Sequence, residues 1–179
     1  MITLDLPDAG AVKQAVYLPA LRSFLLRARR AVALPGQVSI LLTSDKEIRR
    51  LNRIYRGKDK ATDVLSFPAA ALPKKNVSIR SAIDTQRLAQ PTIAGDLAIS
   101  VDTAARQAKQ FGHPVQIELK ILILHGLLHL GGLDHEADAG EMASREDQLR
   151  RRFCLPTALI ARTVVTSPIT RATRNGGRR

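Results

Sequence analysis

Aromatic side chains and cysteines are scarce in this chain of 179 residues. Phe, Tyr and Trp together make up 3% of it and Trp is absent, so a core has to be built mainly from Leu, Ile, Val and Ala. Hydrophobic residues reach 45%, enough for a sizeable core, and the length fits one domain of about 100–200 residues. The lone cysteine, Cys154, has no disulfide partner within the chain, which excludes a disulfide-stapled scaffold.

Long apolar runs are also missing. No stretch approaches the roughly 18 consecutive apolar residues that indicate a membrane span. The start of the chain, Met1–Asp5, lacks the basic residues and the apolar run of a signal peptide. We therefore expect a cytoplasmic protein with no membrane partner.

Acidic residues are few relative to basic ones. The chain has 16 Asp and Glu against 28 Lys and Arg, a net charge of +12. Such a balance attracts polyanions, either nucleic acid or an anionic membrane surface. The excess is concentrated from Arg150 to Arg179, where eight arginines and no acid occur. We interpret 156–179 as a basic, flexible extension that can add non-specific phosphate contacts, and 1–155 as the folded domain.

Hydrophobic periodicity and turn residues predict the secondary structure. Strands are predicted within residues 1–10, 38–42, 62–67 and 97–101. Helices are predicted over 18–32, 103–111, 115–130 and 140–152, and a further one through Ile54 that Ser44 or Asp45 can cap. Asp102 is the predicted cap of the helix over 103–111. The stretch 69–94 contains two prolines and no sustained periodicity, which indicates a long loop. Strands mixed with helices, without a regular βαβ repeat, predict an α+β domain with a small mixed sheet of about four strands.

The segment from His125 to His135 carries three of the four histidines of the chain. His125 and His129 stand at i and i+4 on a predicted helix and project from one face, and Gly131-Gly132 lets the chain turn back so that His135 joins them. Three neutral imidazoles suit Zn²⁺ and leave a fourth position open, which is typical of a catalytic site. Core packing is the weaker interpretation, because three unpaired imidazoles would be costly to bury. We predict one zinc ion per chain.

The same spacing matches the three-histidine pattern of metzincin proteases, including the glycine at position 132. Those enzymes have a glutamate directly after the first histidine as general base, and Gly126 stands there in this chain. Glycine cannot transfer a proton. The segment therefore indicates a metal-dependent hydrolase of another kind, with an atypical metalloprotease as an alternative.

Three segments resemble the YbeY-type endoribonucleases, a family of ribosomal RNA maturation factors. They are Leu51–Asp59 continuing into Thr62–Pro68, Gly95–Ser100, and the histidine segment through His135. The resemblance implies one α+β domain with a zincin-like metal helix beside a small sheet. It also implies a single-strand-specific endoribonuclease that matures small-subunit ribosomal RNA and acts in ribosome quality control. Its partners would be single-stranded RNA, ribosomal RNA and the small ribosomal subunit or its proteins.

The resemblance also points to site residues. It makes the three histidines the metal ligands and presents Arg56 to an RNA-binding cleft. Arg56 precedes Gly57 and Lys58, which can hold a phosphate, and a guanidinium can bind a phosphate through two hydrogen bonds. A solvated arginine at a helix end is the other interpretation. Ala61 departs from the family, which commonly has proline there, so the turn before Thr62 is expected to be less rigid.

Other polar residues are weaker candidates. Asp63, Ser66 and Asp96 can line a cleft, or equally cap or bridge the backbone. Asp134, next to the third histidine, is a candidate for orienting an imidazole from behind. No residue stands out as general base, and the attacking group is left open between a metal-activated water and the ribose 2′-hydroxyl. An RNA-binding assembly factor with weak catalysis is the remaining alternative function.

Overall fold

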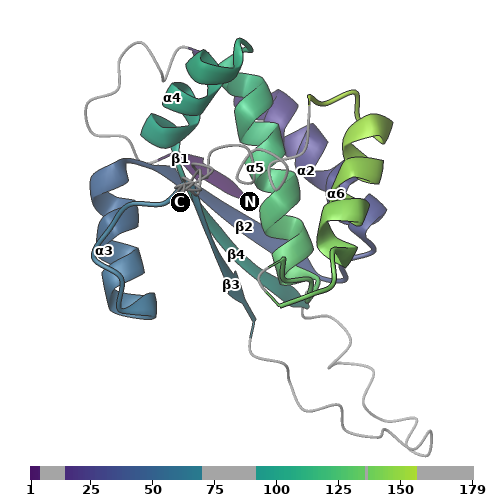
Figure 1. Cartoon of the computed structure of the whole chain (residues 1–179), viewed down its shortest axis with the longest axis horizontal. Helices are drawn as coiled ribbons and strands as arrows, with labels where there is room; N and C mark the ends of the chain where they lie inside the picture. The colour runs from purple at the N-terminus through teal and green to yellow at the C-terminus, as the bar shows by residue number, and fades with distance from the viewer. Residues whose placement is uncertain (5–14, 70–91, 136, 157–179) are drawn as a thin grey trace, which may run out of the picture.

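The computed structural model describes residues 1–4, 15–69, 92–135 and 137–156 (Figure 1). The predicted loop over 69–94 and the predicted extension over 156–179 fall almost entirely outside these ranges, as do residues 5–10 of the first predicted strand. Within the described ranges, none of the helices combines the length and the apolar character needed to cross a membrane.

Four strands form one mixed sheet in the order β1-β2-β4-β3. The first three strands in this order are parallel, and β3 runs antiparallel to β4 at one edge. The strands are β1 (Ile2–Leu4), β2 (Gln37–Thr43), β3 (Val64–Pro68) and β4 (Ile93–Ser100). The predicted α+β class and the small mixed sheet are therefore confirmed.

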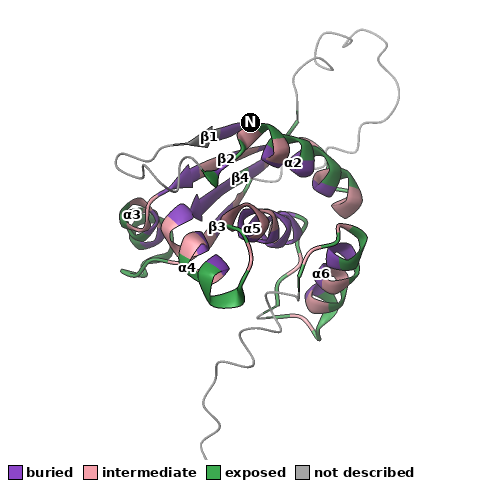
Figure 2. Ribbon diagram, turned by 90° about the horizontal axis from the view of Figure 1, so that it is seen from above, coloured by how far each residue is buried: buried purple, intermediate pink, exposed green. Residues whose placement is uncertain are grey.

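Five helices in the described ranges cover the two faces of this sheet unequally. They are α2 (Leu18–Val32), α3 (Asp45–Arg56), α4 (Val101–Phe111), α5 (Val115–Leu130) and α6 (Glu141–Arg152). The main core lies between the sheet and α2, α4, α5 and α6, whereas α3 lies apart from α2, α5 and α6, beyond the strands (Figures 1 and 2). The predicted bounds of α2 and α5 are confirmed, since turn residues flank a clear apolar pattern in both.

The alternation of side chains along β4 separates two cores. Leu97 and Ile99 point into the main core with α5, while Ala98 points the other way and packs with Leu65 and with Ile48 of α3. This is the period of two expected of a strand. The position of a residue along β4 therefore determines the face of the sheet on which its side chain lies.

Helix α5 is the central element of the main core. It contacts α2, α4, α6, β3 and β4, and eleven of its 16 residues are buried. A helix that is apolar all round is stable only inside a protein. Its position is therefore set by the whole fold, and so is the position of the histidines that it carries.

The start of α4 differs from the prediction. Asp102 is not its cap: the helix begins at Val101, two residues earlier than expected, and the Ser100 hydroxyl accepts a hydrogen bond of 3.0 Å from the backbone N–H of Thr103. Asp102 instead accepts a 2.9 Å hydrogen bond from the backbone N–H of Asp45 in the first turn of α3. The Asp45 carboxylate in turn accepts a 2.7 Å hydrogen bond from the Thr103 hydroxyl and pairs with Arg106 at 2.8 Å. Hydrogen bonds and an ion pair thus join the starts of the two helices.

Candidate functional site

Two of the predicted ligands lie on α5 and the third lies just beyond it. His125 is 5% exposed, His129 is half-buried and His135 is exposed. The chain leaves α5 through Gly132, whose φ of +89° is a conformation that favours glycine. A 3.1 Å hydrogen bond from the Leu133 N–H to the Leu128 carbonyl closes the turn. The turn carries His135 back to the helix face that bears His125 and His129.

The geometry of the three imidazoles fits a metal ion. The Nε2 atoms of His125 and His129 are 3.2 Å apart, and one nitrogen from each ring of the triad lies within 4.8 Å of the others. Tetrahedral zinc with bonds of about 2.0–2.1 Å sets its ligands about 3.3 Å apart. Among the described residues, this triad is the one cluster of His, Cys, Asp or Glu side chains close enough to share an ion. The three histidines could therefore hold a metal ion between them.

The environment of His129 favours the neutral, metal-binding form of its ring. Burial lowers the pKa of His129, and the charges of His125 and His135 lower it further. The charge of Asp134 and a hydrogen bond with the backbone of Leu133 act in the opposite direction but do not prevail. A histidine must be unprotonated to bind a metal, so the lowered pKa favours metal binding by His129.

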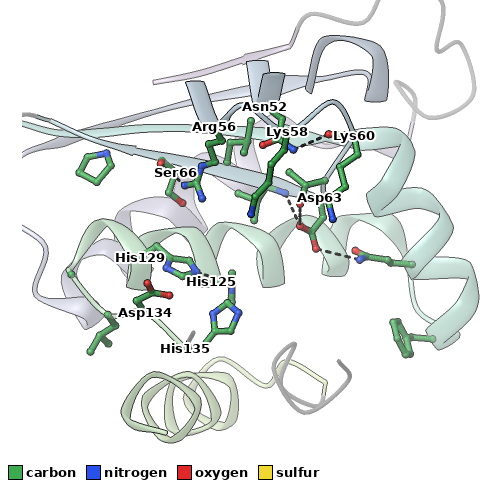
Figure 3. Close-up of a pocket in the computed structure, with 18 of the residues that line it drawn as sticks. Asn52, Arg56, Lys58, Lys60, Asp63, Ser66, His125, His129, Asp134 and His135 are labelled. Carbon is green, nitrogen blue, oxygen red and sulfur yellow. Dashed lines mark hydrogen bonds between the residues drawn. The ribbon is translucent and has the colours of Figure 1, made fainter. Parts of the chain in front are cut away.

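A cleft of about 690 Å³ separates the triad from a wall of basic residues. Arg56, the last residue of α3, lies on this wall, and its Nη2 donates a 3.3 Å hydrogen bond to the Ser66 carbonyl. Lys58 and Lys60 follow it, and the side-chain amide of Asn52 donates to the Lys60 carbonyl at 2.8 Å. Figure 3 shows these cationic side chains across the cleft from the imidazoles. The predicted residues Arg56 and Lys58 therefore do lie together with the triad.

Asp63 and Ser66 also line the cleft, and both make contacts within the protein. Asp63 accepts hydrogen bonds from the backbone N–H of Val64 at 2.8 Å and from the side-chain amide of Gln107 at 3.3 Å. The Ser66 hydroxyl, in a residue that is 8% exposed, is 3.5 Å from the Gly126 carbonyl on α5. These contacts tie β3 to α4 and α5, and they shape the cleft.

Asp96 lies elsewhere. It is exposed and shares the face of β4 that carries Ala98, opposite to Leu97 and α5. There it borders a separate hollow together with Tyr55 and Phe67. Because side chains alternate along a strand, Asp96 is directed away from the histidine cleft.

One residue that contacts a histidine of the triad was not predicted by the sequence analysis. Glu146 of α6 is fully buried, and its Oε2 lies 3.5 Å from Nδ1 of His125. Burial by itself would raise the pKa of Glu146, but the hydrogen bond with His125 and the charge of Arg150 outweigh it and hold that pKa below its ordinary value. The signal in the sequence is its spacing: Glu146 falls between the buried residues Met142 and Leu149 on one helix face. Asp134, the predicted partner, is exposed and acts on His129 through its charge.

Gly126 faces the sheet. A Cβ at this position would lie 2.8 Å from Cδ2 and 3.0 Å from Cδ1 of Leu97 in β4. Any side chain here would have to displace the core, so the place where metzincins carry their general base is closed by packing. Among the described residues that line the cleft, the acidic ones are Asp63 and Asp134.

Comparisons with known proteins agree with the resemblance. Residues 13–153 match the family model described as Endoribonuclease YbeY. A protein of that name from Koribacter versatilis is 46% identical over 97% of this chain and 97% of its own length. Another, from Solibacter usitatus, is 45% identical over 80% and 84%. A Thermotoga maritima protein solved in solution is 24% identical, with a TM-score of 0.50 over 86% of this chain and 92% of its own, which bears on the fold alone.

Proposed function

This chain belongs to the endoribonuclease YbeY family, and on that premise we propose that it cleaves phosphodiester bonds of RNA in the cleft between the histidine triad and Arg56. One observation carries the proposal: imidazoles arranged to hold an ion face a row of cationic side chains across a single cleft. Cations on one wall suit the phosphates of an RNA backbone, and an ion on the other suits the reacting phosphate.

The metal of this proposal is one zinc ion per chain, held by His125, His129 and His135. Three imidazole nitrogens are a ligand set that zinc favours, and they leave a position open toward the cleft. When bound, zinc supplies a Lewis acid for the phosphate and activation of a nucleophile. The protein contributes three neutral imidazole rings in a fixed geometry, two of them from one rigid helix.

Arg56 and Lys58 are proposed as the RNA-binding residues. Both are exposed, so they reach a phosphate without first being desolvated. The contact of Arg56 with the Ser66 carbonyl holds the guanidinium on the cleft side of α3, and a guanidinium binds two phosphate oxygens at once where a lysine acts as a point charge. Asp63 and Ser66 are proposed to shape the cleft, and Asp134 to adjust the charge at His129.

The proposed substrate is single-stranded RNA, in the cell the ribosomal RNA of the small subunit. Support comes from the family and from the net charge of +12. On this proposal the protein works in the cytoplasm with the small ribosomal subunit, in rRNA maturation and ribosome quality control. Residues 1–155 form the catalytic domain, and the extension over 156–179 adds phosphate contacts.

The test is cleavage of end-labelled RNA by zinc-loaded protein. We expect internal cuts in single-stranded RNA, fewer in a duplex of the same sequence, and none after the metal is removed by a chelator. His129→Ala should abolish cutting, whereas Asp96→Asn, on the other face of β4, should leave it unchanged. Comparing mature ribosomal RNA ends in cells with and without the protein tests the cellular part.

Two results would contradict the proposal and favour an alternative. A zinc-loaded preparation that is inert on every RNA but degrades casein would indicate a metalloprotease. One that is inert on both, yet binds small ribosomal subunits, would indicate an assembly factor.

A further inference from the structure

An ion pair is buried in the core directly behind the metal site. Glu146 is 0% exposed and Arg150, one turn later on α6, is 1% exposed. Removing two charges from water costs several kcal/mol per ion, and apolar residues of similar volume often stabilise a core at least as well. Stability alone therefore gives no reason for a carboxylate and a guanidinium at these positions. Their reason lies in what they contact.

The two oxygens of Glu146 have different partners. Oε1 accepts hydrogen bonds from Nη2 and Nε of Arg150, at 2.7 Å and 3.1 Å. Oε2 lies 3.5 Å from Nδ1 of His125. The other nitrogen of that ring, Nε2, is the one that lies 3.2 Å from Nε2 of His129 in the triad. The His125 ring thus stands between the buried carboxylate and the position of the proposed ion.

We propose that Glu146, held in place by Arg150, is a positioning residue for the metal: it accepts the Nδ1–H of His125 and so fixes the ring with the lone pair of Nε2 directed at the ion. This inference rests on the metal site of the proposed function. A ligand histidine commonly donates its other ring N–H to a carboxylate, which sets its tautomer and orientation and strengthens its bond to the metal.

Arg150 keeps the carboxylate from turning away. Two N–H groups of its planar guanidinium donate hydrogen bonds to Oε1 of Glu146, and Nη1 donates to the Pro156 carbonyl at 3.0 Å. A lysine would offer one ammonium and no such planar pair of N–H groups. Rotation of the Glu146 carboxylate would break one of these hydrogen bonds, so Oε2 stays directed at His125.

A second buried histidine–glutamate pair provides a matched control. Nε2 of His113 lies 2.9 Å from Oε2 of Glu118, and their side chains are 10% and 0% exposed. This pair also places a histidine nitrogen beside a buried carboxylate, and it lies at the start of α5, outside the triad. Glu118→Gln therefore perturbs a buried pair of the same kind without touching a proposed ligand.

The experiment measures zinc affinity directly, by competition with a chromophoric chelator, for the full chain and for the variants Glu146→Gln and Glu118→Gln. We expect E146Q to bind zinc about 10–100-fold more weakly, the usual effect of losing such a partner, and E118Q to match the unmodified chain. Circular dichroism establishes that each variant is folded. If E146Q does not fold, Glu146→Asp keeps the charge beside Arg150 but shortens its reach to His125, and it should still bind zinc more weakly.

A second measurement is independent of the metal. Nitrogen-15 NMR of the histidine rings in the metal-free protein should show His125 protonated on Nδ1, and E146Q should lose that preference while E118Q retains it. Folded E146Q or E146D with unchanged zinc affinity, or a His125 tautomer that does not respond, would overturn the inference. Neither measurement uses RNA. A chain that binds zinc through this pair and leaves RNA intact would refute the proposed function and not this one.

Discussion

Replacing Gly126 with alanine tests how closely α5 is packed on the sheet. Alanine is preferred to glycine inside a helix by about 0.5–1 kcal/mol, so an unobstructed site would be stabilised. Here the new Cβ would lie 2.8 Å from Cδ2 of Leu97, well inside the optimal carbon–carbon separation of about 3.5–4.0 Å. Leu97 is 1% exposed and belongs to the main core.

The two effects oppose each other, and the packing effect is the larger. Overpacking a core costs about 1–3 kcal/mol, so the net result for Gly126→Ala is a loss of about 1 kcal/mol in the free energy of unfolding. Urea unfolding measures it, with an unchanged slope as evidence that the denatured state is not altered. Leu97→Ala removes both Cδ atoms that obstruct the new Cβ.

A double-mutant cycle separates the two effects. In the Leu97→Ala background, Gly126→Ala should stabilise the protein by about 0.5–1 kcal/mol, the helix-propensity value alone. The change of sign is the prediction. If Gly126→Ala stabilises the protein equally in both backgrounds, α5 is not in tight contact with β4, and the packing explanation for glycine at this position is refuted.

Three further predictions concern charge. Arg56→Glu should lower kcat/KM for single-stranded RNA by about 100-fold, and Lys46→Glu, an equal reversal on the same helix outside the cleft, should have little effect; similar losses in both would mean a general charge effect. Deleting 166–179 should weaken RNA binding more at low salt than at high salt in a filter-binding assay, and no change at low salt would exclude phosphate contacts by this segment. Burial by itself raises the pKa of Asp45, but hydrogen bonds from hydroxyls at the start of α4 and the pair with Arg106 hold that pKa below its ordinary value. The Asp45 carboxylate therefore stabilises the protein fully at a pH above its pKa in the unfolded chain. This contribution is lost as the pH falls through its lower pKa in the folded protein. Thermal unfolding of Asp45→Asn should show a flatter acid limb, and an unchanged limb would refute this.

The sequence predicted best those helices whose apolar pattern and flanking turn residues indicate the same ends. Helices α2 and α5 have the predicted bounds because Pro35-Gly36 comes shortly after the first and Gly131-Gly132 directly after the second. The predicted start of α4 was wrong because Ser100 and Asp102 are both good capping residues. Local propensity does not indicate which of the two caps the helix. Asp102 instead accepts a hydrogen bond from the backbone N–H of Asp45, a residue distant in sequence.

The candidate site also has residues that the sequence could predict and residues that it could not. The histidine triad was predictable because its spacing follows from helix geometry and one glycine turn. The placement of Asp96 was not, because the face of a strand depends on register with its neighbours. Glu146 was missed because its partner, His125, lies on another helix, and the sequence alone does not pair helix faces. Chemistry within one element is therefore readable from the sequence, and chemistry between elements requires the fold.

Helix α5 both carries two histidines of the triad and forms much of the main core, since the residues around these histidines are buried there. A substitution there changes stability and metal geometry together, which leaves little freedom for adaptation. The basic wall differs, because Arg56 and Lys58 are exposed and outside both cores. New preferences among RNA substrates can therefore arise on that wall at little risk to folding, while the metal helix stays as it is. One side of the cleft can therefore change without loss of folding, and the other side cannot.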